Sequence, residues 1–207
     1  MQLLSSILWL ILGPIRLHRT LEGLQGLQPM YSDVVLKSLP NEVQEISDIY
    51  AINMINTIHL MPTKVHPLIS EQPVLTSCPT VTSSQHWKSP LVCIHGFDSS
   101  CLEFRRLFPK LSKYRNVYAP DLLGWGFTDC RAVKDFSPKA KLEHLKCFIE
   151  QIVQQPCILI GASLGGGIAI NLAAEICPDL VKCVVLLDAQ GFIDGQGPSN
   201  LPRFVAK

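Results

Sequence analysis

Ser163 is the residue whose neighbours most strongly predict chemistry. It lies in the run Gly161-Ala162-Ser163-Leu164-Gly165, a Gly-x-Ser-x-Gly pattern between an apolar segment and a segment with helical character. A serine at a sharp strand-to-helix turn presents its hydroxyl above a sheet, and flanking glycines avoid collisions between a Cβ atom and nearby backbone. The pattern therefore predicts a nucleophile at Ser163, flanked by the required glycines Gly161 and Gly165.

Two other interpretations of this glycine-rich turn are weaker. A phosphate-binding loop would carry Gly-x-x-x-x-Gly-Lys-Ser/Thr, which is absent, and no Lys or Arg is close to the turn in the sequence. A turn that serves only tight packing of a helix stays open as an alternative.

Acyl transfer at a serine also needs hydrogen-bond donors for the developing oxyanion, and two backbone N–H groups suffice. Leu164 follows the nucleophile close to the amino terminus of the predicted helix. Phe97 follows His95 and Gly96 at the end of an earlier apolar run. The N–H groups of Phe97 and Leu164 are therefore the candidate oxyanion donors. For His95, a structural role that holds this loop by hydrogen bonds is favoured over a direct catalytic role.

The elements that must position these residues alternate along the second half of the chain. Continuous apolar runs predict buried parallel strands at 91–94, 117–119, 157–160 and 181–187. Helices are predicted after a Ser-x-x-Glu capping box at 100–103, from 137 to a stop at Pro156, and over 168–176. This order predicts an α/β fold with a doubly wound, mostly parallel sheet of about four core strands and right-handed crossovers.

We expect residues 1–87 to form a helical and Pro-rich N-terminal extension, and residues 88–207 to form the α/β domain. Asn41 and an apolar stripe at 43, 46, 50, 54 and 58 predict one amphipathic helix. Prolines among Ser and Thr at 62–90 predict a linker with one short strand near Val74. The apolar run at 3–15 is too short to cross a bilayer. It is compatible with organelle targeting, a signal anchor, or a helix packed on the protein's own core.

Composition excludes several classes of protein. With 18 Lys and Arg against 17 Asp and Glu, the net charge is +1, so nucleic acid is not an expected partner. The apolar fraction of 47% and the charged fraction of 17% predict a packed core rather than disorder. The 8 cysteines show no zinc-ligand spacing, which favours free thiols in an intracellular protein with no metal or cofactor.

Three segments, in this order, resemble the serine α/β-hydrolase superfamily. They are Pro90-Leu91-Val92-Cys93-Ile94-His95-Gly96-Phe97, Asp121-Leu122-Leu123-Gly124-Trp125-Gly126-Phe127-Thr128-Asp129 and Gly161-Ala162-Ser163-Leu164-Gly165-Gly166. Residues 98–103 and 188–192 resemble in particular a plant branch of α/β-hydrolase-like proteins, several of them plastid-directed. The resemblance covers residues 88–207. It implies that Trp125 is a wall of the pocket and that Asp121 and Asp129 hold their loop in shape.

The chain also departs from the family pattern, in which an acid and then a histidine follow the nucleophile. All 6 histidines precede Ser163, and only His95 is expected near it. We therefore expect this chain to be the amino-terminal portion of a longer hydrolase, with weak or no catalytic activity on its own. By the same resemblance, the run at 181–187 would be left with a free sheet edge that favours self-association.

The leading hypothesis is a serine hydrolase of a small apolar carboxylic ester or related acyl substrate. Acyl transfer and lyase chemistry on the same scaffold stay open. A dehalogenase or an epoxide hydrolase is disfavoured because it needs a carboxylate at the elbow. The alternatives are a non-catalytic α/β-hydrolase-like protein that binds a ligand or partner chain, and a fragment without a stable fold. We also expect weak membrane association through residues 3–15. The resemblance to the plant branch implies a plastid location.

Overall fold

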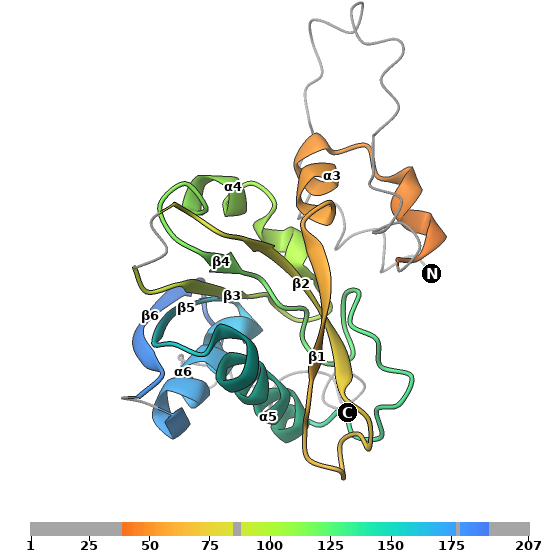
Figure 1. Ribbon diagram of the computed structural model, residues 1–207, viewed down its shortest axis with the longest axis vertical. Helices are drawn as coiled ribbons and strands as arrows, with labels where there is room; N and C mark the ends of the chain where they lie inside the picture. The colour runs from red at the N-terminus through yellow and green to blue at the C-terminus, as the bar shows by residue number, and fades with distance from the viewer. Residues whose placement is uncertain (1–38, 85–87, 177–178, 191–207) are drawn as a thin grey trace, which may run out of the picture. The chain divides into compact units, whose positions relative to one another are not determined.

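A six-stranded sheet forms the centre of the computed structural model, which describes residues 39–84, 88–176 and 179–190 (Figure 1). The strand order is β1-β2-β4-β3-β5-β6. The strands are β1 (Ile58–Thr63), β2 (Val74–Val81), β3 (Leu91–Ile94), β4 (Val117–Tyr118), β5 (Cys157–Ala162) and β6 (Val181–Leu187). β4, β3, β5 and β6 are parallel, whereas β1 and β2 form an antiparallel pair that joins β4. The predicted mostly parallel α/β sheet is confirmed.

Helices cover both faces of this sheet, as the alternation of side chains along β3 shows. Leu91 and Cys93 pack in a cluster with the 3-10 helix η2 (Cys101–Phe104) and with α4 (Phe108–Leu111). Val92 and Ile94 pack in the opposite cluster, with α5 (Pro138–Phe148) and α6 (Leu164–Ile176). Because successive strand residues point to opposite faces, the two clusters lie on opposite sides of the sheet. The doubly wound architecture is therefore confirmed.

The interpretation of residues 62–90 as a linker with one short strand near Val74 is wrong in part. A strand does begin at Val74, but it has 8 residues, and both it and the end of β1 belong to the sheet. β1 and β2 pair from Ile58 opposite Pro79 to Thr63 opposite Val74. The prolines do not prevent this pairing. Pro62 lies in β1, the outer strand of the sheet within the described residues, where a missing N–H is tolerated. Pro79 uses its carbonyl to accept the Ala119 N–H at 3.1 Å. The sheet thus begins ahead of the boundary predicted at residue 88, and it has six strands rather than about four.

The apolar stripe from 43 to 58 is not one helix. It is divided between the 3-10 helix η1 (Asn41–Glu45), the helix α3 (Ile49–Ile55) and the start of β1. Ile46 has an extended backbone, and Asp48 starts α3 because its carboxylate accepts the Tyr50 N–H at 2.8 Å. A second N-cap interrupts the stripe that the spacing had predicted as continuous.

The helix predicted to begin at Ser137 is confirmed. The Ser137 hydroxyl accepts the Ala140 N–H at 3.2 Å, and Pro138 occupies the first turn. The helix α5 continues into a single π-helical stretch, η3 (Ile149–Val153), which ends at Gln154 in the left-handed conformation with φ 55°. The helix α6 begins at Leu164 rather than at the predicted residue 168, so three consecutive glycines of low helix propensity lie in its first turns.

β6 is an outer strand within the described part of the chain, where it pairs only with β5. Val185, Leu186 and Leu187 are exposed, at 41%, 44% and 37%. The seven described cysteines are free thiols, and burial raises the pKa of Cys93 to about 12. Among the described residues, no helix is both long enough and apolar enough to cross a membrane. The run at 3–15 lies outside the described residues, so its interpretations stay predictions, as does self-association through β6.

Candidate active site

Ser163 occupies a sharp turn between β5 and α6. Its φ is 49°, in the left-handed region that residues other than glycine rarely adopt, and its side chain is exposed. Three backbone hydrogen bonds of 3.0 Å hold this conformation: the Ser163 N–H donates to Leu187, and the Ser163 carbonyl accepts from Gly166 and Gln190. Strain that the surroundings enforce in this way is typical of functional positions.

The two glycines of the motif allow the start of α6 to pack directly on the sheet. A Cβ atom on Gly161 would lie 2.4 Å from the Gly165 carbonyl oxygen. A Cβ atom on Gly165 would lie 2.1 Å from the carbonyl oxygen of Ile94 and 2.6 Å from that of His95. Neither position can hold a side chain without moving backbone, so both glycines are required for the close approach of the helix to the end of β3.

The loop after β3 lies against this turn. A Cβ atom on Gly96 would be 3.3 Å from Ser163 Cβ, so the two residues are in near contact. Phe97 follows Gly96, and its side chain is 52% exposed. Leu164 follows Ser163 as the first residue of α6. Neither the Phe97 N–H nor the Leu164 N–H is among the backbone hydrogen bonds of the described loops and turns. Both residues adjoin the near contact between Gly96 and Ser163.

His95 is fully buried, and both of its ring nitrogens are used within the loop. Nδ1–H donates to the Gly96 carbonyl at 2.8 Å, and Nε2 accepts the Leu122 N–H at 3.0 Å. These partners fix the neutral tautomer that is protonated at Nδ1. Burial lowers the pKa of His95, although Asp121 at 3.9 Å opposes this effect. His95 could take the proton of Ser163 only by breaking these bonds.

Asp121 ties three segments together. Its Oδ1 accepts the Cys101 N–H at 2.6 Å, and its Oδ2 accepts the Phe127 N–H at 2.9 Å and the Ser77 hydroxyl. Burial raises the pKa of Asp121, while His95 and these hydrogen bonds oppose the rise. A Cβ atom on Gly126 would lie 2.2 Å from Asp121 Cγ. The carboxylate thus anchors the loop 120–129 beside the elbow.

Trp125 and Asp129 take different places in that loop. The Trp125 ring lies edge-on to the Phe97 ring, with the ring centroids 5.3 Å apart and an interplanar angle of 71°. Lys141 Nζ lies 4.4 Å from the centroid of the Trp125 ring. The Asp129 N–H donates to Leu75 at 3.0 Å, which attaches the loop to β2. Trp125 therefore borders Phe97, and Lys141, which no sequence pattern singled out, supports it from α5.

Glu103 is a second residue that sequence reasoning missed at this site. Its half-buried carboxylate accepts the Gly96 N–H through Oε2 at 2.8 Å. The capping-box pattern did point to Glu103, but with the wrong partner. Ser100 caps η2 by accepting the Leu102 N–H at 3.3 Å. The reciprocal bond from the Ser100 N–H to Glu103 is not among the hydrogen bonds of the described residues, because the carboxylate turns to the loop instead.

The described residues do not complete a catalytic triad. No hydrogen bond joins the Ser163 hydroxyl to a histidine or a carboxylate in the described ranges. His144 is buried elsewhere, with Nε2 2.8 Å from the Thr76 hydroxyl. Asp188, which follows β6, is exposed and has a φ of 49°. No group of three or more His, Cys, Asp or Glu side chains that could hold a metal ion occurs among the described residues.

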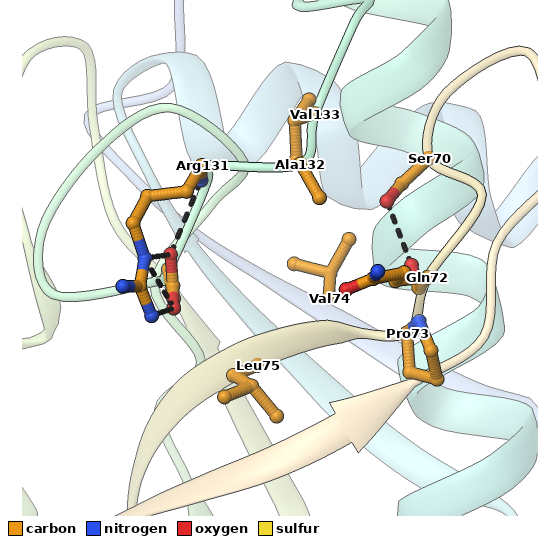
Figure 2. Close-up of a pocket in the computed structure, with 9 residues that line it drawn as sticks. Ser70, Gln72, Pro73, Val74, Leu75, Arg131, Ala132 and Val133 are labelled. Carbon is orange, nitrogen blue, oxygen red and sulfur yellow. Dashed lines mark hydrogen bonds and ion pairs between the residues drawn. The ribbon is translucent and has the colours of Figure 1, made fainter.

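A pocket with a volume of about 320 Å³ lies between the start of β2 and the loop 129–133, and Figure 2 shows its lining. Ser70 donates its hydroxyl proton to the Gln72 carbonyl at 2.7 Å. The exposed Arg131 pairs with Asp129 at 2.6 Å. The lining contains none of the residues predicted for catalysis, so this pocket is separate from the elbow.

Comparison with known proteins gives consistent results. The sequence profile of the alpha/beta hydrolase fold family matches residues 89–207. The chain is 35% identical over 170 residues to the alpha/beta hydrolase domain-containing protein VTE7 of Arabidopsis thaliana, covering 81% of this chain and 51% of VTE7. It is 32% identical over 105 residues to 2-hydroxymuconate semialdehyde hydrolase of Pseudomonas sp. strain CF600, covering 49% of this chain and 37% of that protein.

Solved structures give the same result. The meta-cleavage product hydrolase CumD of Pseudomonas fluorescens superposes with a TM-score of 0.51 at 30% identity, covering 57% of this chain and 43% of CumD. An esterase of Exiguobacterium antarcticum superposes with a TM-score of 0.52 at 20% identity, covering 66% of this chain and 50% of the esterase, a likeness of fold alone. The chain spans about half or less of the length of each of these proteins.

Proposed function

Because this chain belongs to the α/β-hydrolase family, we propose that Ser163 is the nucleophile of a serine hydrolase that acts on carboxylic esters or related acyl compounds. The observation that carries the proposal is the strained turn. A non-glycine residue with φ 49° joins a buried strand to a helix and is itself exposed. Structural packing alone needs the two glycines, but it gives no reason for a serine in this conformation.

The proposed reaction uses the two backbone donors beside Ser163. Attack of Ser163 Oγ on the acyl carbon moves the electron pair of the C=O bond onto oxygen. The N–H groups of Phe97 and Leu164 would stabilise this oxyanion, each contributing about 3 kcal/mol. The amino terminus of α6, a helix of 13 residues, adds a favourable dipole at the same place. The proton of the Ser163 hydroxyl passes to a general base during the attack. Collapse of the intermediate expels the leaving group, which takes up that proton and departs as the alcohol, and water then hydrolyses the acyl-enzyme to the acid and free Ser163.

A general base is still required, and His95 is committed to Gly96 and Leu122. We therefore propose that the histidine and its partner acid are supplied from outside the described residues. The chain as given should then hydrolyse esters only at a residual rate, the contribution of the oxyanion hole and of binding. Because no histidine or carboxylate of the described residues is hydrogen-bonded to the Ser163 hydroxyl, a second candidate function is also favoured, in which the site binds an apolar ligand without turning it over.

Chemical rescue separates these two functions. Free imidazole supplies a general base, so hydrolysis of p-nitrophenyl butyrate by the 207-residue chain should rise with imidazole concentration beyond the rate measured with Ser163→Ala. That variant corrects for hydrolysis by imidazole itself. Ser112→Ala, at the end of α4, is the matched control and should behave as wild type. Equal rates for wild type and Ser163→Ala at every imidazole concentration would reject a nucleophilic role.

A further inference from the structure

Side chains hold Gly96 through both of the peptide groups that it joins. The Gly96 carbonyl, in the Gly96–Phe97 peptide, accepts Nδ1–H of His95 at 2.8 Å. The Gly96 N–H, in the preceding His95–Gly96 peptide, donates to Glu103 at 2.8 Å. Because the peptide bond is planar and trans, its C=O and its N–H point in opposite directions. A Gly96 carbonyl directed at the buried His95 therefore leaves the Phe97 N–H pointing away from that ring.

Glu103 is placed close to the serine as well as to the loop. A Cβ atom on Gly96 would lie 3.6 Å from Glu103 Oε2 and 3.3 Å from Ser163 Cβ, so the carboxylate and the elbow border the same point. Gly96 can form this bridge because it has no side chain between the two groups. The contact joins η2 to the loop that carries a proposed oxyanion donor.

The bond from Gly96 to Glu103 is not a by-product of helix capping or of an ion pair. The sequence around Ser100 has the spacing for a reciprocal capping box, yet Glu103 turns to Gly96. None of the ion pairs found among the described residues includes Glu103. The Gly96 N–H is thus the partner that accounts for the position of this half-buried carboxylate.

We propose that Glu103 is a positioning residue of the active site. By accepting the Gly96 N–H, it fixes Gly96 on one side while His95 holds the Gly96 carbonyl on the other, so that the Phe97 N–H of the next peptide faces the oxygen of a substrate at Ser163. The inference rests on the proposed role of Phe97 as an oxyanion donor. Glu103 itself touches neither the substrate nor the reacting atoms.

Glu103 has two effects on the site, through its hydrogen bond to Gly96 and through its negative charge, and substitution by glutamine separates them. A carboxylate near a developing oxyanion is electrostatically unfavourable, so the benefit of Glu103 lies in the hydrogen bond and not in its charge. Glutamine can accept the same N–H through its amide oxygen without the charge. Glu103→Gln should therefore keep kcat at the wild-type level or raise it. Glu103→Ala and Glu103→Met, which lack the acceptor, should lower kcat at least tenfold, toward the roughly 100-fold loss caused by removing a donor.

The first measurement is independent of catalysis. Amide hydrogen exchange of Gly96 is followed by NMR in the 207-residue chain and in each variant. Glu103→Ala and Glu103→Met should accelerate exchange at Gly96 at least tenfold, whereas Glu103→Gln should not. The use of two acceptor-free variants means that a folding defect in one does not decide the result. Glu150→Ala, which removes an exposed carboxylate on η3, is the matched control.

The second measurement is the kcat and KM of Ser163-dependent hydrolysis in the presence of imidazole. A fall in kcat with KM unchanged within twofold, restored in Glu103→Gln, supports the proposal, because an oxyanion donor acts mainly in the transition state. The role of Glu103 is overturned if amide exchange at Gly96 is unchanged in both acceptor-free variants, or if exchange is faster and kcat does not fall. A different result, the absence of Ser163-dependent turnover in the wild-type chain, would refute the proposed function itself.

Discussion

Gly165→Ala tests the packing that brings the elbow together. The added Cβ atom would lie 2.1 Å from the Ile94 carbonyl oxygen, 2.6 Å from the His95 oxygen and 2.7 Å from the Ile94 carbonyl carbon. All three atoms belong to the backbone of a central strand and its exit loop, so no side-chain rotation relieves the contact. The helix and the strand must move apart by about 1 Å to reach ordinary van der Waals separation.

The cost follows from overpacking and helix propensity. Overpacking typically costs about 1–3 kcal/mol, and backbone obstacles favour the upper end. Replacing glycine by alanine inside a helix returns about 1 kcal/mol. The net loss should be about 2 kcal/mol, which lowers the midpoint of thermal unfolding by roughly 6 °C for a chain of this size.

Gly167→Ala is the matched control in the same helix. Its Cβ atom would meet only the Gln190 carbonyl oxygen, at 3.8 Å, an ordinary contact. Gly167→Ala should therefore gain stability by about 1 kcal/mol from helix propensity alone. The difference between the two variants, about 3 kcal/mol in urea unfolding followed by circular dichroism, isolates the contact between α6 and β3. If Gly165→Ala is as stable as Gly167→Ala, the close approach of the helix to the strand is refuted.

Three further predictions concern buried or strained groups. Ser163→Gly should be more stable than Ser163→Ala by about 1 kcal/mol, and so unfold at a higher temperature, because glycine adopts φ 49° without strain. Equal stability of the two variants would mean that the turn is relaxed. Burial lowers the pKa of His144 to about 4, below its unfolded value of 6.5. As the pH falls, the unfolded chain therefore binds the proton before the folded chain does. The free energy of unfolding should decrease by up to about 3 kcal/mol between pH 6.5 and pH 4. Urea titrations at several pH values should show a weaker dependence in His144→Gln, and an unchanged one would assign the effect elsewhere. Asp121→Asn should destabilise the protein by about 1–3 kcal/mol, because the amide cannot accept all three donors, and wild-type thermal stability in this variant would contradict the anchoring role.

The sequence is most informative where chain-local chemistry decides the structure. The four parallel strands were predicted because a strand covered on both faces is a continuous apolar run, and the run at 157–160 leads directly into the glycine-rich turn. Ser137 followed by Pro138 marked a helix start that the structure confirms. The placement of Ser163 between a strand and a helix followed from the same local signals.

The features that the sequence did not reveal depend on partners far away in the chain. β1 was missed, and β2 was predicted only as a short strand near Val74, because their prolines signal irregular structure, whereas the pairing between the two strands tolerates them. Glu103 was assigned to its own helix start, because the distance between residues 96 and 103 in space does not follow from local spacing. Lys141 has no motif, and only the fold places it 4.4 Å from the Trp125 ring centroid.

The central claim is that the Ser163 hydroxyl faces the backbone N–H groups of Phe97 and Leu164. The most direct measurement is a crystal structure of the 207-residue chain after reaction with a fluorophosphonate, with imidazole present as the base. The account predicts a covalent adduct on Ser163 whose phosphonyl oxygen lies about 2.7–3.1 Å from both backbone nitrogens. An adduct on another residue, or a phosphonyl oxygen that contacts neither nitrogen, would contradict it.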